Sequence, residues 1–399
     1  MSSKTINVCL IGQKFMGRAH SNAYVSAPRF FNLPVNPMMH TIVARDIDSL
    51  QEFAHRWGWT NATTDWRTAV NDPQIDLVDV TTPNNKHKEF VLEALNAGKH
   101  VACEKPLAAS LDDAREMLAA AKRAKKSKTF VWYNYRRVPA VAAAYNLARE
   151  GRLGRIYHVR AYYLQGWASS PDIPLVWRFD KDQAGSGSLG DLGAHVIDMA
   201  RFITADEISE IVGAMSETFI KERVIPSGEG GAGIASGATT SGKTKKGKVT
   251  VDDAIVAIGK MKQGAVFTIE ATRFATGDEN KHGVEINGEK GSVFFNFEDL
   301  NNLYYFDATQ PRHVQGWTKI QASVPGVHPY QHAYWPTAHP GGYEHAFVNQ
   351  AADICRVLGG EEPEIPLPDF ADAFETQRVL EAIERAAKER RAVKLSEVK

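Results

Sequence analysis

INVCLIGQKFMG, residues 6 to 17, joins a short apolar run of strand-forming residues to a glycine turn and the start of a helix. Strand, tight turn and helix in this order open a dinucleotide-binding fold, whose usual signature is G-x-G-x-x-G. Gly12 and Gly17 occupy the first and third glycine positions, and Lys14 replaces the second, where it would offer its amine to phosphates. A βα turn that binds no ligand explains two glycines nearly as well.

The residues up to 133 continue this alternation of strand-like and helix-like segments. We expect strands at 6–11, 40–44, 76–80, 100–103 and 129–133, and helices that include 48–57, 88–97 and 110–122. Such alternation predicts an α/β domain with a doubly wound parallel sheet of the Rossmann type. The sequence therefore places a dinucleotide-binding domain at residues 1–133.

Polar residues follow two of these strands, where open α/β sheets bind their ligands. Arg45 and Asp46 come after the second strand. An acidic residue there takes the ribose hydroxyls of NAD, whereas an arginine stacks on adenine or holds the 2′-phosphate of NADP. In VACEKP, residues 101–106, Lys105 stands at the end of an apolar strand. The charge of a lysine responds strongly to burial and to neighbouring groups, so Lys105 is a candidate for proton transfer. A surface Glu-Lys pair before a loop is the alternative.

Beyond residue 133 the pattern changes to a helix at 139–149 followed by consecutive β-rich segments. These segments are 156–165, 208–220, 253–261, 265–273, 283–286 and 292–297, with hairpin-like turns at 263–264 and 287–288. The pattern predicts, for residues 134–399, an α+β domain with a large open, mostly antiparallel sheet. Residues 226–248 are rich in Gly, Ser, Thr and Lys, so we expect a mobile loop there.

Composition argues against several classes of function. Lysine and arginine number 47 and so do aspartate and glutamate, so no net field favours nucleic acid or an anionic membrane as partner. No window approaches the ~20 apolar residues of a membrane span, and no signal peptide opens the chain. The three cysteines show no metal or disulfide spacing. These features predict a cytoplasmic protein with free thiols.

Asp191 and His195 stand four residues apart in a helix-like stretch, which brings them to one face. Such a pair binds a metal, orients a catalytic imidazole or forms an ordinary polar contact, and the spacing leaves all three open. Four histidines between residues 328 and 345 invite a zinc interpretation, but their spacing fits no familiar ligand template. We therefore expect no metal.

Taken together, the motifs resemble those of the Gfo/Idh/MocA oxidoreductase family over nearly the whole chain. The matching stretches are GQKFMGRAH at 12–20, Thr82-Pro83-Asn84 with His87, Glu104-Lys105-Pro106, Asn134-Tyr135-Arg136, GSGSLGDLGAHVID at 185–198 and 252–254. Their order and spacing are specific, and Lys14 is the departure.

The resemblance implies NAD as cofactor, with NADP not excluded, and it assigns three groups of residues. Cofactor-binding residues are Gly12, Lys14, Phe15, Met16, Arg45, Asp46, Thr82, Pro83, Asn84, His87, Glu104, Lys105 and Asn134. Catalytic residues are Lys105, Asp191 and His195, with His195 as base, Asp191 as its orienter or an acceptor for a substrate hydroxyl, and Lys105 beside the reacting oxygen. Substrate-binding residues are these three with Tyr135, Trp167, Arg178 and His345.

The activity implied is hydride transfer between nicotinamide and a secondary hydroxyl of a cyclic sugar, polyol or glycoside, as in the sugar-oxidising branch of that family. Two alternatives stand beside it. One is an enzyme that retains NAD and cleaves glycosides through transient oxidation, and the other is a cofactor-binding regulator without catalysis. The resemblance also implies a homodimer or homotetramer formed through the C-terminal sheet.

Overall fold

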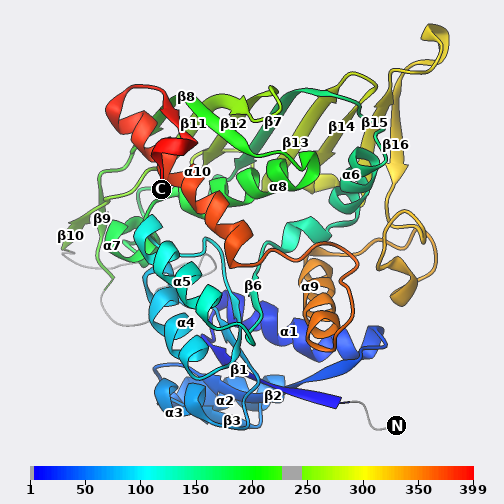
Figure 1. Ribbon diagram of the computed structural model, residues 1–399. Coiled ribbons are helices and arrows are strands. Elements are labelled where there is room, and N and C mark those ends of the chain that lie inside the picture. The colour runs from blue at the N-terminus through cyan, green and yellow to red at the C-terminus, as the bar shows by residue number, and fades with distance from the viewer. Residues whose placement is uncertain (1–3, 227–244) are drawn as a thin grey trace. The chain divides into compact units, whose positions relative to one another are not determined.

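The computed structural model describes residues 4–226 and 245–399 and divides into two compact units (Figure 1). The first unit comprises Met1–Val138 and Pro329–Phe374, and the second comprises Pro139–His328 and Glu375–Lys399. The sequence placed one boundary, after residue 133. In the structure both units are discontinuous, because the segment Pro329–Phe374 returns to the first unit and Glu375–Lys399 belongs to the second.

The first unit contains a six-stranded parallel sheet in the order β3-β2-β1-β4-β5-β6. Its strands are β1 (Lys4–Ile11), β2 (Val35–Val43), β3 (Asn61–Thr63), β4 (Leu77–Val80), β5 (His100–Cys103) and β6 (Thr129–Val131). The helices between them are α1 (Phe15–Phe30), α2 (Ile47–Trp57), α3 (Trp66–Asn71), α4 (His87–Asn96) and α5 (Leu111–Arg123). This is the Rossmann order, as the sequence predicts.

The central strands are buried along their length. Val8, Leu10, Val78 and Val101 have no exposed surface, as expected for a parallel sheet covered by helices on both faces. The predicted start of the α5 helix is confirmed, since the Ser110 hydroxyl accepts a hydrogen bond from the Asp113 N–H at 3.2 Å. The carboxyl ends of β2, β1, β4, β5 and β6 therefore form one edge of the sheet.

Two features of this unit differ from the sequence prediction. Strand β2 begins at Val35 rather than residue 40, because Pro37 and its neighbours pair with β1, and the short β3 was not predicted as a strand. The returning segment carries α9 (Tyr343–Leu358), which packs on α1. Asp353 of α9 accepts hydrogen bonds from Arg137 Nε at 3.1 Å and the Tyr330 hydroxyl at 2.5 Å, all three side chains being buried. These contacts explain why the segment belongs here.

The second unit contains a nine-stranded sheet in the order β16-β15-β14-β13-β7-β12-β11-β8-β17. Its strands are β7 (Ile156–Leu164), β8 (Ile208–Glu217), β11 (Ala254–Met261), β12 (Val266–Thr272), β13 (Lys281–Gly288), β14 (Gly291–Asn296), β15 (Asn302–Asp307), β16 (Trp317–Gln321) and β17 (Val393–Lys394). The β12–β7 pair is parallel and the other pairs are antiparallel, which confirms the mostly antiparallel sheet.

Helices α6 (Pro139–Arg149) and α8 (Ala194–Thr204) lie together beside this sheet (Figure 1). Helix α10 (Phe370–Glu389) begins in the first unit and ends in the second. Along β11, Ile255 and Ala257 are buried while Val256 and Ile258 are 40% and 48% exposed. The pleat therefore turns one apolar face toward the core and another outward.

Three sequence predictions for this unit need correction. Strands β15, β16 and β17 were not predicted, and the turn between β13 and β14 lies at 289–290 instead of 287–288. Of the predicted loop at 226–248, Lys246–Lys248 forms β10, paired with β9 (Glu222–Val224), because its backbone finds an antiparallel partner. Residues 227–244 of that loop lie outside the described residues.

Candidate active site

The glycine turn after β1 is closed by backbone contacts. Gly12 has φ +118°, and its N–H donates to the carbonyl of Val43 at 2.9 Å. A side-chain carbon at Gly12 would lie 2.5 Å from Thr81 Oγ1, and one at Gly17 would lie 2.2 Å from the carbonyl oxygen of Gly12. The turn accepts only glycine at both positions, which leaves its backbone open to a ligand.

Lys14, Phe15 and Met16 stand at the beginning of α1, with Lys14 at the N-cap position. The N-terminus of a helix of this length favours anions, because its first N–H groups have no partners within the helix. The Phe15 ring is 41% exposed and lies nearly parallel to Tyr343, with ring centres 6.4 Å apart. The aromatic pair of Phe15 and Tyr343 therefore lies next to the predicted phosphate site.

Arg45 and Asp46 are exposed at the end of β2. Asp46 caps α2, since its carboxylate accepts from the Asp48 N–H at 3.1 Å and from the Ser49 hydroxyl at 2.9 Å. The hydrogen bond from Ser49 is the main cause that lowers the pKa of Asp46. Ser49 also accepts from Gln13 Nε2 at 2.8 Å, which joins the glycine turn to the start of α2.

Glu104 and Lys105 follow β5. Glu104 is 5% exposed, and its Oε2 accepts from the N–H of Lys105 at 3.1 Å. Its Oε1 lies 3.0 Å from Nε2 of the buried His20. Glu104 is therefore committed to protein contacts that fix the turn from which Lys105 projects.

His87, predicted to bind cofactor, is fully buried and bonded to the protein. Its Nδ1 lies 3.2 Å from the carbonyl oxygen of Leu107, and its Nε2 lies 3.0 Å from that of Thr82. Burial lowers the pKa of this imidazole. His87 joins the loop after β4 to the loop after β5. Its contribution to the site is therefore to hold the backbone at Thr82 in position.

In the second unit, Asp191 lies in a turn that is wider than the predicted α-helix, and His195 lies in the α-helix that follows. Leu189–Gly193 is a π-helical turn, closed by a hydrogen bond from the Ala194 N–H to the Leu189 carbonyl, and α8 follows. The extra residue changes which side chains share a face relative to the predicted four-residue spacing. Asp191 Oδ2 lies 3.9 Å from Arg178 Nε, so the structure brings these two predicted residues together.

Aromatic rings surround His195, which is 7% exposed. The ring centre of Tyr163 lies 6.1 Å from that of His195, and the ring of His282 lies at 6.3 Å. Tyr163 and His282 stack at 4.5 Å, and burial lowers the pKa of His282 to about 3. At neutral pH His282 is therefore a neutral ring within this cluster.

A chain of hydrogen bonds runs from Tyr163 to Trp167. The Tyr163 hydroxyl and Gln165 Nε2 both donate to Asn280 Oδ1, at 2.8 and 2.7 Å. Gln165 Oε1 in turn accepts from Trp167 Nε1 at 3.0 Å. Residues 163, 165 and 167 alternate along the strand and its extension, so one polar and aromatic wall includes the predicted Trp167. Tyr163 and Gln165 were not predicted from the sequence as site residues, although their alternation with Trp167 was an available signal.

Comparison with known proteins decides the family. Residues 6–133 match the oxidoreductase family with an NAD-binding Rossmann fold, and residues 141–294 match the Gfo/Idh/MocA C-terminal domain. This chain belongs to the Gfo/Idh/MocA oxidoreductases. Levoglucosan dehydrogenase of Pseudarthrobacter phenanthrenivorans is 40% identical over 391 residues, which are 97% of each chain.

Solved structures agree with this membership of the Gfo/Idh/MocA family. An oxidoreductase domain protein from Kribbella flavida has a TM-score of 0.91 and 44% identity. Levoglucosan dehydrogenase in complex with NADH and levoglucosan has a TM-score of 0.89 and 38% identity. Each comparison covers 98% of this chain and 99% of the other.

Three features of the first unit are consistent with binding of NAD, the cofactor of the Gfo/Idh/MocA family. The glycine turn leaves no room for side chains at residues 12 and 17. Thr82 Oγ1 and Asn134 Nδ2 are buried, and neither finds a hydrogen-bond partner within the described residues. Buried polar atoms without protein partners are costly unless a ligand satisfies them. Pro83 and Asn84 begin a short helical turn next to Thr82.

Two residues predicted to bind substrate in this Gfo/Idh/MocA member, Tyr135 and His345, lie in the first unit. Tyr135 lies against Tyr343, with ring centres 6.4 Å apart. His345 Nδ1 accepts from the Gly342 N–H at 3.0 Å, and the His345 ring contacts Tyr334 edge-on at 4.6 Å. The predicted set is thus divided, with Asp191, His195, Trp167 and Arg178 in the second unit.

Within 4–226 and 245–399, no group of three or more His, Cys, Asp or Glu side chains is arranged to hold a metal ion. In the same ranges, no helix combines the length and the apolar character that crossing a membrane requires.

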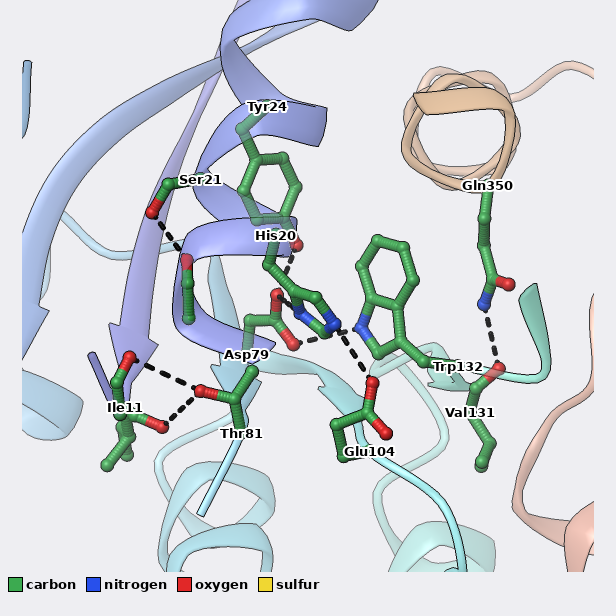
Figure 2. A network of polar contacts seen from close by, with 12 residues as sticks. Ile11, His20, Ser21, Tyr24, Asp79, Thr81, Glu104, Val131, Trp132 and Gln350 are labelled. Carbon is green, nitrogen blue, oxygen red and sulfur yellow. Dashed lines mark hydrogen bonds and ion pairs between the residues drawn. The ribbon is translucent and has the colours of Figure 1, made fainter. Parts of the chain in front are cut away.

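The main feature that sequence reasoning missed is a buried network around Asp79 (Figure 2). Asp79 accepts hydrogen bonds from the Tyr24 hydroxyl at 2.8 Å and from Trp132 Nε1 at 3.0 Å, and it contacts His20 at 2.8 Å. A carboxylate in the otherwise apolar β4 was the available signal, because an unpaired charge is rarely buried.

Proposed function

We propose that this protein uses NAD to oxidise a secondary hydroxyl of a cyclic sugar, polyol or glycoside. The observation that carries the proposal is the set of polar and aromatic contacts in the second unit. Asp191 lies beside Arg178, the ring of His195 lies beside that of Tyr163, and hydrogen bonds join Tyr163 to Trp167 through Asn280 and Gln165. A sugar ring has apolar C–H faces and a rim of hydroxyls, which suit aromatic side chains and charged or imidazole groups respectively. The identity to levoglucosan dehydrogenase over 97% of both chains supports the same substrate class.

Bound NAD would supply the acceptor for the hydride that leaves the substrate carbon. His195 is the base that takes the hydroxyl proton, and Lys105 places a positive charge beside the oxygen as negative charge develops on it. Asp191 orients the imidazole or accepts a hydrogen bond from a neighbouring substrate hydroxyl. Arg178 Nε, 3.9 Å from Asp191 Oδ2, places a positive charge beside that side chain.

On the cofactor side, we assign the phosphates to the glycine turn, Lys14 and the beginning of α1. Asp46 or its neighbours would hold the ribose, and Arg45 would stack on the adenine. Thr82, Asn84 and Asn134 supply polar groups to the rest of the cofactor, and NADP remains the alternative to NAD. Thr82 Oγ1 and Asn134 Nδ2, which are buried and find no hydrogen-bond partner in the described part of the chain, support this assignment.

The exposed apolar face of the second unit's sheet supports a homo-oligomer. Outward side chains of three neighbouring strands are large, apolar and 40–65% exposed: Val212 and Met215 of β8, Val256 and Ile258 of β11, and Val266 of β12. A contiguous apolar surface of this kind favours a protein partner, and we propose a second copy of the chain. Ile258→Lys should shift the molar mass in light scattering to that of the monomer, and an unchanged mass would reject this face.

A substrate screen tests the proposed activity. Levoglucosan, aldoses, inositols and glycosides are each incubated with NAD or NADP, and reduced nicotinamide is followed by its absorbance. We expect reduction of NAD with a cyclic sugar or anhydrosugar. Cleavage of a glycoside by bound cofactor, without added NAD, would establish the alternative reaction. Tight binding of NAD with no turnover on any of these compounds would favour a regulator.

A further inference from the structure

The imidazole of His20 lies in α1 with no exposed surface, and each of its ring nitrogens faces a carboxylate. Nδ1 lies 2.8 Å from Asp79 Oδ2, and Nε2 lies 3.0 Å from Glu104 Oε1 (Figure 2). An ionised carboxylate only accepts hydrogen bonds, whereas a neutral imidazole has one donor nitrogen and one acceptor nitrogen. With both carboxylates ionised, the two contacts are hydrogen bonds together only when the ring is an imidazolium.

Two other donors hold Asp79, so the orientation of this carboxylate is over-determined. The Tyr24 hydroxyl donates to Asp79 Oδ2 at 2.8 Å, and Trp132 Nε1 donates to Asp79 Oδ1 at 3.0 Å. Burial by itself lowers the pKa of His20, but the charges and hydrogen bonds of Asp79 and Glu104 outweigh it and raise the pKa to about 9. The geometry and the electrostatics agree on a charged ring at neutral pH.

Glu104 carries the effect of this ring to the catalytic turn. One of its carboxylate oxygens contacts His20, and the other accepts from the N–H of Lys105 at 3.1 Å. The Glu104 N–H also donates to the carbonyl of Val80 at 2.9 Å. The direction in which Lys105 leaves the sheet therefore depends on a carboxylate that His20 holds in place.

We propose that His20 is a positioning residue for the catalytic turn, its imidazolium joining Glu104 to Asp79 and thereby orienting Lys105. The inference rests on the proposed function, in which Lys105 acts on the reacting oxygen. His20 itself touches neither substrate nor cofactor in this assignment.

Other titratable groups around the network stay neutral near pH 7. Burial raises the pKa of the thiols of Cys9 on β1 and Cys103 on β5, and that of the hydroxyls of Tyr24 on α1 and Tyr343 on α9. Burial lowers the pKa of His87 on α4. The charges that face one another are His20, Asp79 and Glu104, with Lys105 next along the chain.

The network therefore responds to pH in a defined way when His20 is replaced. Without a cation between them, two buried carboxylates in contact with the same side chain repel one another, and one of them gains a proton at higher pH than usual. In His20→Gln, we expect this protonation to occur at higher pH than in wild type, and to alter the orientation of Lys105 as it occurs.

The test compares wild type, His20→Gln and the matched variant Tyr24→Phe, which removes a neutral donor from Asp79 but leaves both charged contacts. In His20→Gln, kcat should fall about 10- to 100-fold with little change in NAD affinity, and a new ionisation should appear in the pH profile of kcat. Tyr24→Phe should change kcat less than about threefold, with the wild-type pH profile, because the charged contacts remain. A purely structural role would lower stability in both variants without the new ionisation.

Nitrogen NMR of histidine-labelled wild type provides a second readout that needs neither variant nor substrate. The His20 ring should be protonated on both nitrogens at pH 7 and titrate near 9. A neutral ring at pH 7 would overturn the inference even if His20→Gln did not fold. So would a His20→Gln enzyme with the wild-type kcat and pH profile, or Tyr24→Phe changes as large as those of His20→Gln. A wild type without sugar-oxidising activity would instead reject the proposed function on which the inference rests.

Discussion

Gly17 lies so close to Gly12 that a side-chain carbon at residue 17 would lie 2.2 Å from the carbonyl oxygen of residue 12. The oxygen cannot easily move away, because it belongs to the turn that Thr81 holds with hydrogen bonds of 3.0 and 3.3 Å to the carbonyls of Ile11 and Gly12. A methyl group at residue 17 would therefore push α1 away from the turn on which the cofactor depends.

Gly17→Ala should lower the free energy of unfolding by about 1–3 kcal/mol, because the new methyl group would clash with the backbone carbonyl of Gly12, which cannot move as easily as a side chain. It should also weaken NAD binding at least tenfold, as measured by fluorescence of the bound cofactor. Gly316→Ala is the control, because nothing lies within 4 Å of its new carbon, and it should stay within about 0.5 kcal/mol of wild type. Wild-type affinity in Gly17→Ala would show that the turn does not bind the cofactor.

Lys105→Ala and His195→Ala should each lower turnover about 10²-fold or more, while NAD affinity changes little. Asp191→Asn should cost less, because its shape and part of its hydrogen bonding remain. The double variant of Lys105 and His195 should be less impaired than the product of the two single effects, since both serve one proton transfer. Steady-state kinetics on a verified sugar would reject the assignment if Lys105→Ala retained wild-type turnover.

Asp46 has two roles that substitution can separate. Asp46→Ala loses the cap of α2, which should cost about 1 kcal/mol of stability, whereas Asp46→Ser retains a capping oxygen. Both variants lack the carboxylate proposed for the ribose, so both should raise the KM for NAD by a similar factor. If only Asp46→Ala raised that KM, the effect would come from the helix cap. A preference for NADP that disappears in Arg45→Ala would reverse the cofactor assignment.

Because of His20, the free energy of unfolding should fall as the pH rises into the alkaline range. Its folded-state pKa of about 9 lies above the usual 6.5, so the folded state binds more protons between these values. The resulting stability is fully present below pH 6.5 and is lost as pH rises through 9. Urea denaturation of wild type should show this loss, and His20→Gln should lack this component. A His20→Gln profile that declines as steeply as wild type would assign the loss to other groups.

Much of the fold is predictable because it depends on neighbours in the sequence. The apolar run before Gly12 predicts β1, and the 100–103 segment predicts β5 within the observed bounds. The end of β2 was close but its start was not, because residues 35–39 join the sheet through pairing with β1 rather than through their own strand propensity. The return of the 329–374 segment depends on buried partners such as Arg137 and Asp353, 216 residues apart, which no local pattern reveals.

By itself the sequence determined the alternation of strands and helices in the first domain, the glycine turn and the residue types available for oxidoreductase chemistry. It did so because hydrophobic period, turn residues and motif spacing are local properties. Only the tertiary structure decided that Asp191 lies in a π-helical turn, that His87 serves the loops around Thr82, and that His20 meets Glu104, which lies 84 residues along the chain. These features arise from contacts between distant segments, where burial removes water and each polar group must find its partner in the protein.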